Sequence, residues 1–528
     1  MGKINILDCT LRDGGYVNDW CFGKDAIIGL LHNMSLANVE CVEVGFLRPV
    51  PYDENRSLFP DKATIDGILK NKNSNIKYFV MFDVSNPVDI DSFPKNDGKG
   101  IDGIRVIFKK DKMSDGIVAV KKFMKLGYLV AANFVSTNFY TDEEFIDGIK
   151  KFNDIKPYTV TIVDTFGSMK NDEFLHYIKL ADKHLDKNIV LSYHAHNNLQ
   201  QAYQNAVSFV NMKLDREILI DASVFGMGRG AGNLNLELFA EYLNANFEKD
   251  YHLVPVLETM DKYLQETYKK NFWGYSLPLY ISGTLNVHPN YAIYLAEKNT
   301  LTEKSLYEIL KNINEEDRQK YKKEIAEKYY SEYMNVYRDD TKDLEKLANE
   351  FKGKNILVLA PGRSINEHKD KINDELSKND TIGISLNFYN NDFKTDYLFS
   401  SNMRRYSKLD DKIGNDIKTK VILTSNMREA ENKDYVINFF SLALESKDII
   451  DNAALMTFKL LIKLGVGSVK VAGMDGYDLH NPYVYSDEST QFDFSNVADM
   501  RNKLIKKELE QIKKSLKLEF ITESLYEV

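Results

Sequence analysis

Short apolar runs alternate with longer amphipathic segments along the first half of the chain. The runs have the length and the β-branched and aromatic content of buried strands. The segments between them, such as 115–127 and 141–153, carry apolar residues at helical spacing. Eight strands alternating with helices within about 240 residues predict a closed parallel barrel inside a ring of helices. The predicted strands are residues 4–10, 39–47, 76–83, 103–110, 128–136, 158–167, 189–197 and 217–228.

A doubly wound open sheet is the alternative, but no glycine fingerprint follows the first predicted strand. After the barrel the pattern becomes mostly helical, and then strands and helices alternate again. We therefore expect an α/β protein: a TIM (β/α)8 barrel over 1–275, a helical extension and linker over 276–349, and a Rossmann-like domain over 350–528. The strands predicted in the last domain lie within 352–372, 380–388, 395–401, 420–426 and 468–477.

The amino-acid composition of the chain argues against some classes of function. The chain is 43% hydrophobic and 28% charged with a net charge of -9, which argues against a protein whose main task is nucleic-acid binding. It has no uninterrupted apolar run long enough for a transmembrane segment, and its first residues lack the layout of a signal peptide. We expect a cytoplasmic protein. Cys9, Cys21 and Cys41 form no CxxC pair and are expected to be reduced thiols.

Four polar side chains are predicted to meet at the carboxyl ends of the barrel strands. Arg12 and Asp13 end the first strand, His194 and His196 end the seventh, and Asn233 follows the eighth. Closure of a barrel makes these strands neighbours, and a spacing of two sends both imidazoles to one face. Such a mixed oxygen and nitrogen set suits Mg²⁺, Mn²⁺, Co²⁺ or Zn²⁺. The alternative for the two histidines alone is a pair with ordinary hydrogen bonds.

Three motifs in this order, "LDCTLRDGG", "HAHNN" and "GMGRGAGN", resemble those of the DRE-TIM metallolyase superfamily. This superfamily includes 3-hydroxy-3-methylglutaryl-CoA lyase, the 4-hydroxy-2-oxovalerate aldolases and the isopropylmalate synthases, and the resemblance covers about residues 1–300, including "GTLNVHPNYA". It implies that the metal ligands are Asp13, His194, His196 and Asn233, and that Arg12 is the family's arginine. A salt bridge to a strand-end acid is the structural alternative for Arg12.

The resemblance implies a divalent-metal-dependent lyase or aldolase that acts through the enolate of a 2-oxo acid such as pyruvate. Mn²⁺ or Mg²⁺ is the expected cofactor, with Co²⁺ or Zn²⁺ as alternatives. The aldolases carry a histidine where this chain has Tyr16, so the general base stays open among Tyr16, His288 and Tyr291. We expect the substrate-binding groups to be Gly14, Gly15, the strand-closing Glu43 and Asp83, and Asp164 and Thr165.

The last domain resembles, more loosely, bacterial sialyltransferase-like and related surface-glycan proteins, whose opening turn contacts a nucleotide. This implies binding of a nucleotide or nucleotide-sugar, and a structural or oligomerisation domain is the alternative. The contact candidates are Gly362, Arg363, Ser364, Asn387 and Asp475.

Together the domains predict a bifunctional, homo-oligomeric enzyme with a small 2-oxo acid substrate in surface-sugar biosynthesis. Two alternatives are a Claisen-type acyl-CoA condensing enzyme and a non-catalytic protein that binds metal and nucleotide.

Overall fold

The structure is a computed structural model that describes residues 2–409, 418–431, 433–477 and 497–527. The chain packs as two compact units, one of residues 1–292 with 318–320 and one of residues 293–317 with 321–528. The domain boundaries predicted at residues 275 and 349 stay a prediction. Every helix in the described part of the chain is too short or too polar to span a bilayer.

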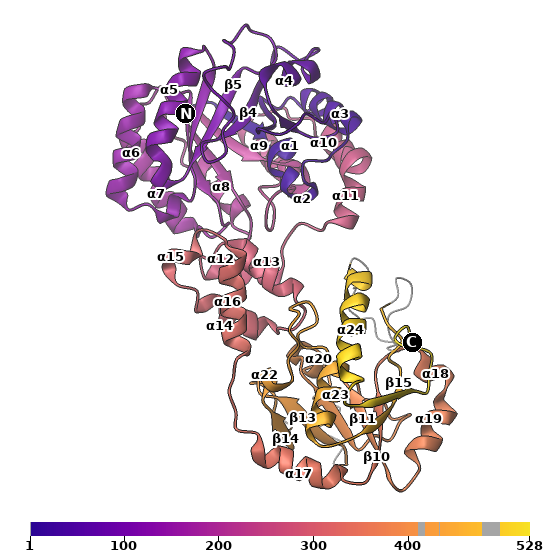
Figure 1. Cartoon of the computed structure of the whole chain (residues 1–528). Coiled ribbons are helices and arrows are strands. Elements are labelled where there is room, and N and C mark those ends of the chain that lie inside the picture. Colours follow the sequence, from indigo (N-terminus) through magenta and orange to yellow (C-terminus); the bar gives the residue numbers. More distant parts are fainter. Residues whose placement is uncertain (1, 410–417, 432, 478–496, 528) are drawn as a thin grey trace. The chain divides into compact units, whose positions relative to one another are not determined.

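The first unit is the closed parallel barrel that the sequence predicts, and pairing of β1 with β2 completes the ring of eight strands. A ninth strand, β3, pairs only with β2. Figure 1 shows helices α5 to α8 outside the strands. The strands are β1 (Ile4–Asp8), β2 (Cys41–Leu47), β3 (Leu58–Phe59), β4 (Lys77–Asp83), β5 (Gly103–Phe108), β6 (Leu129–Phe134), β7 (Thr159–Asp164), β8 (Val190–Ala195) and β9 (Ile218–Ala222).

The barrel strands are buried along almost their whole length because side chains fill the interior and helices cover the outside. One large apolar cluster joins strands and helices. The α-helices of this part are α1 (Thr10–Asp13), α2 (Gly15–Asn18), α3 (Lys24–Leu36), α4 (Lys62–Ile68), α5 (Met113–Lys125), α6 (Asp142–Ile155), α7 (Asn171–His184), α8 (Ala202–Asn211), α9 (Leu236–Phe247), α10 (Leu253–Thr259), α11 (Gln265–Lys270), α12 (Leu277–Thr284) and α13 (Pro289–Glu297), which ends in the second unit.

The chain leaves the first strand earlier than the sequence predicts. Strand β1 ends at Asp8, whose carboxylate accepts a hydrogen bond from the Thr10 hydroxyl. The Cys9 carbonyl then accepts the Asp13 N–H at 2.8 Å, which closes the single helical turn α1. Arg12 and Asp13 therefore lie on a buried helical turn beyond the strand and not at its end.

The second unit contains a seven-stranded parallel sheet in the order β14-β13-β12-β11-β10-β15-β16. All five strands predicted here are present, and the sequence reasoning missed β14 and β16. The order reverses between β10 and β15, the point where open α/β sheets form a crevice at the carboxyl ends of their strands. The strands are β10 (Asn355–Leu359), β11 (Thr381–Leu386), β12 (Tyr397–Ser400), β13 (Lys420–Thr424), β14 (Tyr435–Ile437), β15 (Ser468–Ala472) and β16 (Lys517–Phe520).

Helices cover this sheet, with α19 against β11 and α23 against β12. The α-helices are α14 (Glu303–Lys311), α15 (Glu315–Arg318), which ends in the first unit, α16 (Lys323–Met334), α17 (Thr341–Phe351), α18 (Ser364–Glu367), α19 (Lys369–Leu376), α20 (Met403–Tyr406), α22 (Phe439–Leu442), α23 (Ala453–Lys463) and α24 (Ala498–Ile512).

Candidate metal centre and a second pocket

Three of the predicted metal ligands converge at the mouth of the barrel. One ligand atom each from Asp13, His194 and His196 lies within 4.8 Å of the other two, and all three residues are buried. His194 belongs to β8, and His196 follows that strand. Asn233 forms an antiparallel bridge with His196, and its Nδ2 donates to Asp13 Oδ2 at 2.8 Å. Residues 220 positions apart in the sequence thus meet at one point.

The donor atoms of this group fit a divalent cation. His194 Nε2, His196 Nδ1 and Asn233 Oδ1 are buried and have no hydrogen-bond partner among the described residues. Buried polar atoms are rarely left unpaired, because an unpaired one costs about 1–3 kcal/mol. Together with the Asp13 carboxylate they offer two nitrogen and two oxygen donors, a set that suits a catalytic divalent ion better than a structural zinc site.

Arg12 lies beside the candidate ligands and is buried with them. Its Nε donates to Glu43 Oε2 at 2.7 Å, and its guanidinium pairs with the Asp13 carboxylate. Burial alone would raise the pKa of Asp13, but the charges of Arg12 and the two histidines hold it well below its usual range. The Asp13 side chain is therefore an anion ready to bind a cation.

Comparison with known proteins finds relatives of the barrel. Residues 109–260 match the model of the HMGL-like family. A 4-hydroxy-2-oxovalerate aldolase from Pseudoalteromonas translucida is 23% identical over 251 residues, which cover 46% of this chain and 70% of that protein. An oxaloacetate decarboxylase from Mycobacterium tuberculosis is 22% identical over 258 residues, 48% of this chain and 72% of that protein. Residues 109–260 of the barrel are thus similar to the HMGL-like family.

Solved structures overlap with the chain only in part. The carboxyl transferase domain of Rhizobium etli pyruvate carboxylase with pyruvate gives a TM-score of 0.48 at 14% identity, covering 67% of this chain and 65% of that one. The HMG-CoA lyase from Bacillus subtilis gives a TM-score of 0.40 at 14% identity over 52% of this chain and 94% of that one. These scores add nothing to the topology described above.

Deeper in the barrel lies a buried charge layer that the sequence reasoning missed. Arg105 donates to Glu43 Oε2 at 2.9 Å and pairs with Asp221, which in turn lies 2.9 Å from His194 Nδ1. Burial would raise the pKa of Asp221, and the charge of Arg105 lowers it. Contact with Asp221 fixes the His194 ring so that Nε2 faces the ligand group. The available signal was a charge inside each apolar strand, "GIRVIF" and "ILIDA".

Glu43 has a different place from the one predicted. It is the third of the seven residues of β2, inside the barrel, where it pairs with Arg12 and Arg105. Asp83 is the last residue of β4 and pairs with Arg48 at 3.2 Å. The carboxylates of both residues are therefore engaged by protein arginines.

The three candidates for the general base lie in different surroundings. Tyr16 is 40% exposed, with its ring 4.7 Å from that of Trp20. His288 is buried, and its Nε2 accepts a hydrogen bond from Arg229 at 2.7 Å. Burial and the charges of Arg229 and Lys109 lower the pKa of His288 to about 3, so its ring is neutral. Tyr291 is fully buried, and its hydroxyl donates to the Lys320 carbonyl at 3.1 Å.

The remaining predicted residues of the barrel support its loops. Asp164 ends β7 and accepts the N–H groups of Ser168 and Met169 at 2.9 and 3.1 Å, and burial raises its pKa to about 7. Thr165 Oγ1 accepts the Ser136 N–H.

The two glycines after Asp13 allow close internal packing. A side chain at Gly14 would approach the Thr10 carbonyl to 2.3 Å, and one at Gly15 would approach Trp20 to 2.0 Å. The protein itself thus fills the space that a side chain would take.

The second unit holds a pocket at its sheet reversal, with about 950 Å³ of empty space when its open mouth is counted. The loops after β10, β11, β12 and β15 and the start of α23 line it. Of the predicted nucleotide contacts, Gly362, Asn387 and Asp475 are among the lining residues. Ser364 donates its N–H to Asp475 Oδ2 at 2.9 Å behind this lining, and Arg363 precedes α18.

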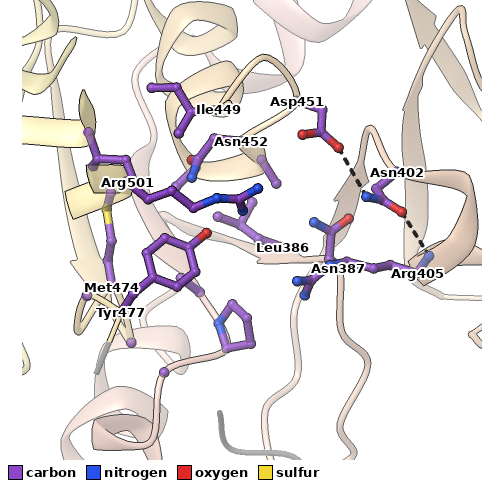
Figure 2. A pocket seen from close by; sticks show the side chains of 18 of the residues that line it. Leu386, Asn387, Asn402, Arg405, Ile449, Asp451, Asn452, Met474, Tyr477 and Arg501 are labelled. Atoms are coloured by element: carbon purple, nitrogen blue, oxygen red, sulfur yellow. Dashed lines mark hydrogen bonds between the residues drawn. The ribbon is translucent and has the colours of Figure 1, made fainter. Parts of the chain in front are cut away.

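Sequence reasoning missed the most polar groups of this pocket. Figure 2 shows Arg501 with Asn452 and Tyr477 on one side and Asn402 with Arg405 on the other. Asp451 is partly buried, and desolvation raises its pKa although Asn402 donates to it at 3.1 Å. No single motif marks these residues because they come from separate loops and helices.

Proposed function

We propose that the barrel is a divalent-metal-dependent lyase or aldolase that makes or breaks a carbon–carbon bond next to the keto group of a pyruvate-like 2-oxo acid. One observation carries this proposal: ligand atoms of His194 and His196, whose rings each have an unpaired nitrogen, converge with the Asp13 carboxylate beside a buried arginine. The family match and the relatives named above, an aldolase and a decarboxylase, support it.

Different residues of the chain would bind the metal, stabilise the developing charge and move the proton. Asp13, His194, His196 and Asn233 would hold Mn²⁺ or Mg²⁺, with Co²⁺ or Zn²⁺ as alternatives. When bound, the ion supplies Lewis acidity toward the oxygen atoms of the substrate. Arg12 would stabilise the negative charge that develops on the keto oxygen, and Glu43 would hold its guanidinium in place. The neutral ring of His288 and the exposed Tyr16 stay the candidates for moving the proton.

Solvent exchange tests this proposal without knowledge of the second substrate. The methyl protons of pyruvate should exchange for deuterium in the presence of protein and one of the four metals, as followed by proton NMR. Arg12→Lys should keep metal binding but slow exchange about 10²-fold, because a point charge replaces a planar fork. Absence of exchange with all four metals would refute the proposal.

A Claisen-type condensation remains the alternative within the enzyme class. It predicts that acetyl-CoA is consumed, and free thiol released, when the protein is given a panel of 2-oxo acids. A non-catalytic role for the barrel predicts metal binding without either reaction. Both readings use the same ligand residues, so the products decide between them.

We further propose that the second unit binds a nucleotide or nucleotide-sugar, which would make the chain a bifunctional enzyme of surface-sugar biosynthesis. The pocket at the sheet reversal favours this: Arg405 and Arg501 suit phosphate, the asparagines suit sugar hydroxyls, and apolar groups suit a base. A cytoplasmic location and a homo-oligomeric state belong to the same proposal.

Calorimetry on the full chain with UDP, GDP and CMP tests the second site. Arg501→Gln and Arg405→Gln should each weaken nucleotide binding about tenfold through loss of a charge-assisted hydrogen bond. Arg338→Gln is the matched control, because Arg338 lies outside this pocket with its side chain half exposed near Asp343. Lack of binding by all three nucleotides would leave the pocket as a structural feature.

A further inference from the structure

Two arginines, Arg12 and Arg229, contact the candidate metal ligand Asp13. Arg12 contacts Asp13 directly, and the Arg229 backbone N–H donates to Asp13 Oδ2 at 3.3 Å. The Arg229 side chain then reaches His288, whose Nε2 accepts its hydrogen bond at 2.7 Å. Arg229 thus contacts the candidate ligand Asp13 through its backbone and His288 through its guanidinium.

The pKa shifts of His288 and Lys109 show that further cations lie close to Arg229. Burial and then the charges of Arg229 and Lys109 lower the pKa of His288. Desolvation, then Lys320 and Arg229, lower the pKa of Lys109 itself. Cations that disfavour one another's charge in this way form a site suited to an anion.

The nearby carboxylates do not cancel this positive charge. Asp111 and Asp83 raise the pKa of Lys109, but the net direction is downward, and Asp83 is already paired with Arg48. The neighbouring Lys110, by contrast, has its own partner in Glu144. Positive charge is therefore in excess at Arg229, Lys109 and Lys320.

We propose that Arg229, with Lys109 and Lys320, binds a second anionic group of the substrate, so that the barrel acts on an acidic 2-oxo compound. This inference rests on the proposed lyase function and extends it. One end of the substrate would lie at the metal ligands beside Arg12, and a distal carboxylate or phosphate would reach the guanidinium of Arg229. A substrate with an uncharged distal end would leave that guanidinium without an anion.

Three stable 2-hydroxy acids test this by calorimetry on the metal-loaded full chain. Lactate has no distal anion, malate has a distal carboxylate and 3-phosphoglycerate has a distal phosphate. Malate or 3-phosphoglycerate should bind at least about tenfold more tightly than lactate, and the stronger of the two identifies the distal group. Arg229→Gln should remove this preference, whereas Lys110→Gln, the matched control, should keep it.

Equal binding of the three acids, or an unchanged preference in Arg229→Gln, would overturn the proposal. If Arg229→Gln loses its far-UV circular dichroism, the double variant Lys109→Gln with Lys320→Gln carries the test and should reduce the preference at least about threefold. Pyruvate exchange, measured in parallel, separates the two ideas. Exchange without a preference removes this inference alone, and a preference without exchange removes the lyase function and leaves the anion site.

Discussion

The barrel site and the pocket of the second unit differ in where they keep charge. In the barrel, Arg12, Asp13, Glu43, Arg105 and Asp221 are all buried and joined by ion pairs. The pocket of the second unit has charged groups along an open lining, and its only strongly desolvated carboxylate among the described lining residues is Asp451. The barrel therefore fixes its charges in place, whereas the pocket leaves them accessible.

This difference indicates different functions for the barrel site and the pocket of the second unit. Burying an ion pair costs desolvation free energy and rarely adds net stability, so a layer of such pairs indicates a role beyond folding. Charges held rigidly in a dry site act strongly on a developing charge, which suits catalysis. Arginines around an open pocket suit reversible binding of an anion. The predictions that follow test whether the two sites divide in this way, from the largest expected effect to the smallest.

Asp13→Ala should have the largest effect. Loss of the anionic ligand should reduce metal-dependent pyruvate exchange about 10³-fold or more, because several kcal/mol of charge stabilisation depend on the bound ion. Far-UV circular dichroism should be unchanged. Asp475→Ala, at the pocket of the second unit, is the matched control and should leave exchange as it is. Equal loss in both variants would contradict a division between the sites.

Removal of Arg105 should destabilise the barrel. Arg105→Met leaves Glu43 and Asp221 buried without their shared partner, which should cost about 3–5 kcal/mol in the free energy of unfolding. Both tryptophans, Trp20 and Trp273, belong to the barrel, so fluorescence during urea unfolding follows this unit alone.

The control for Arg105→Met is Arg56→Met. Arg56 pairs with the exposed Asp19, and losing such a surface pair should cost less than about 1 kcal/mol. A small effect of Arg105→Met would mean that the buried layer is not stabilised by its ion pairs.

Asp221→Asn should weaken metal binding without removing a ligand. Asp221 orients His194 through the contact at Nδ1, and loss of such a partner lowers metal affinity about 10–100-fold. Calorimetric titration with Mn²⁺ measures the change. Asp182→Asn, which alters a pair between the partly exposed Asp182 and the buried Arg216, should leave Mn²⁺ affinity unchanged. Unaltered affinity in Asp221→Asn would show that His194 is oriented by other contacts.

The same contrast explains what could be predicted from sequence. The barrel strands were predictable because each is a continuous apolar run, and Asp13, His194 and His196 were noticed because charges and imidazoles at strand ends are unusual. Arg105 and Asp221 were missed because reasoning was confined to strand ends, whereas a barrel also buries polar layers within its strands. Glu43 was assigned to the wrong depth for the same reason.

In the second unit, prediction from sequence was limited for a different reason. Its sheet was predictable from five apolar runs, but Arg405, Asp451 and Arg501 come from two helices and a loop far apart in the sequence. Their juxtaposition depends on the strand order, which reverses between β10 and β15 and which hydrophobic patterning does not encode. Short strands with half-exposed residues, such as β16, were missed because their alternation is too brief to recognise.

The smallest expected effect concerns His288 and pH. The folded chain keeps this buried ring neutral down to about pH 3, whereas the unfolded chain takes up the proton near the ordinary value of about 6.5. The unfolded state therefore binds more protons as the pH falls below about 6.5, and the stability of the barrel decreases. Between pH ~7 and ~5.5 this contribution is about 1 kcal/mol.

His288→Gln should accordingly flatten the pH dependence of urea unfolding followed by tryptophan fluorescence, with the wild type losing more stability on acidification than the variant. His32→Gln, at an exposed position of α3, is the control and should keep the wild-type slope. An unchanged slope in His288→Gln would mean that the ring accepts a proton in the folded barrel, and a charged ring could not accept the hydrogen bond from Arg229.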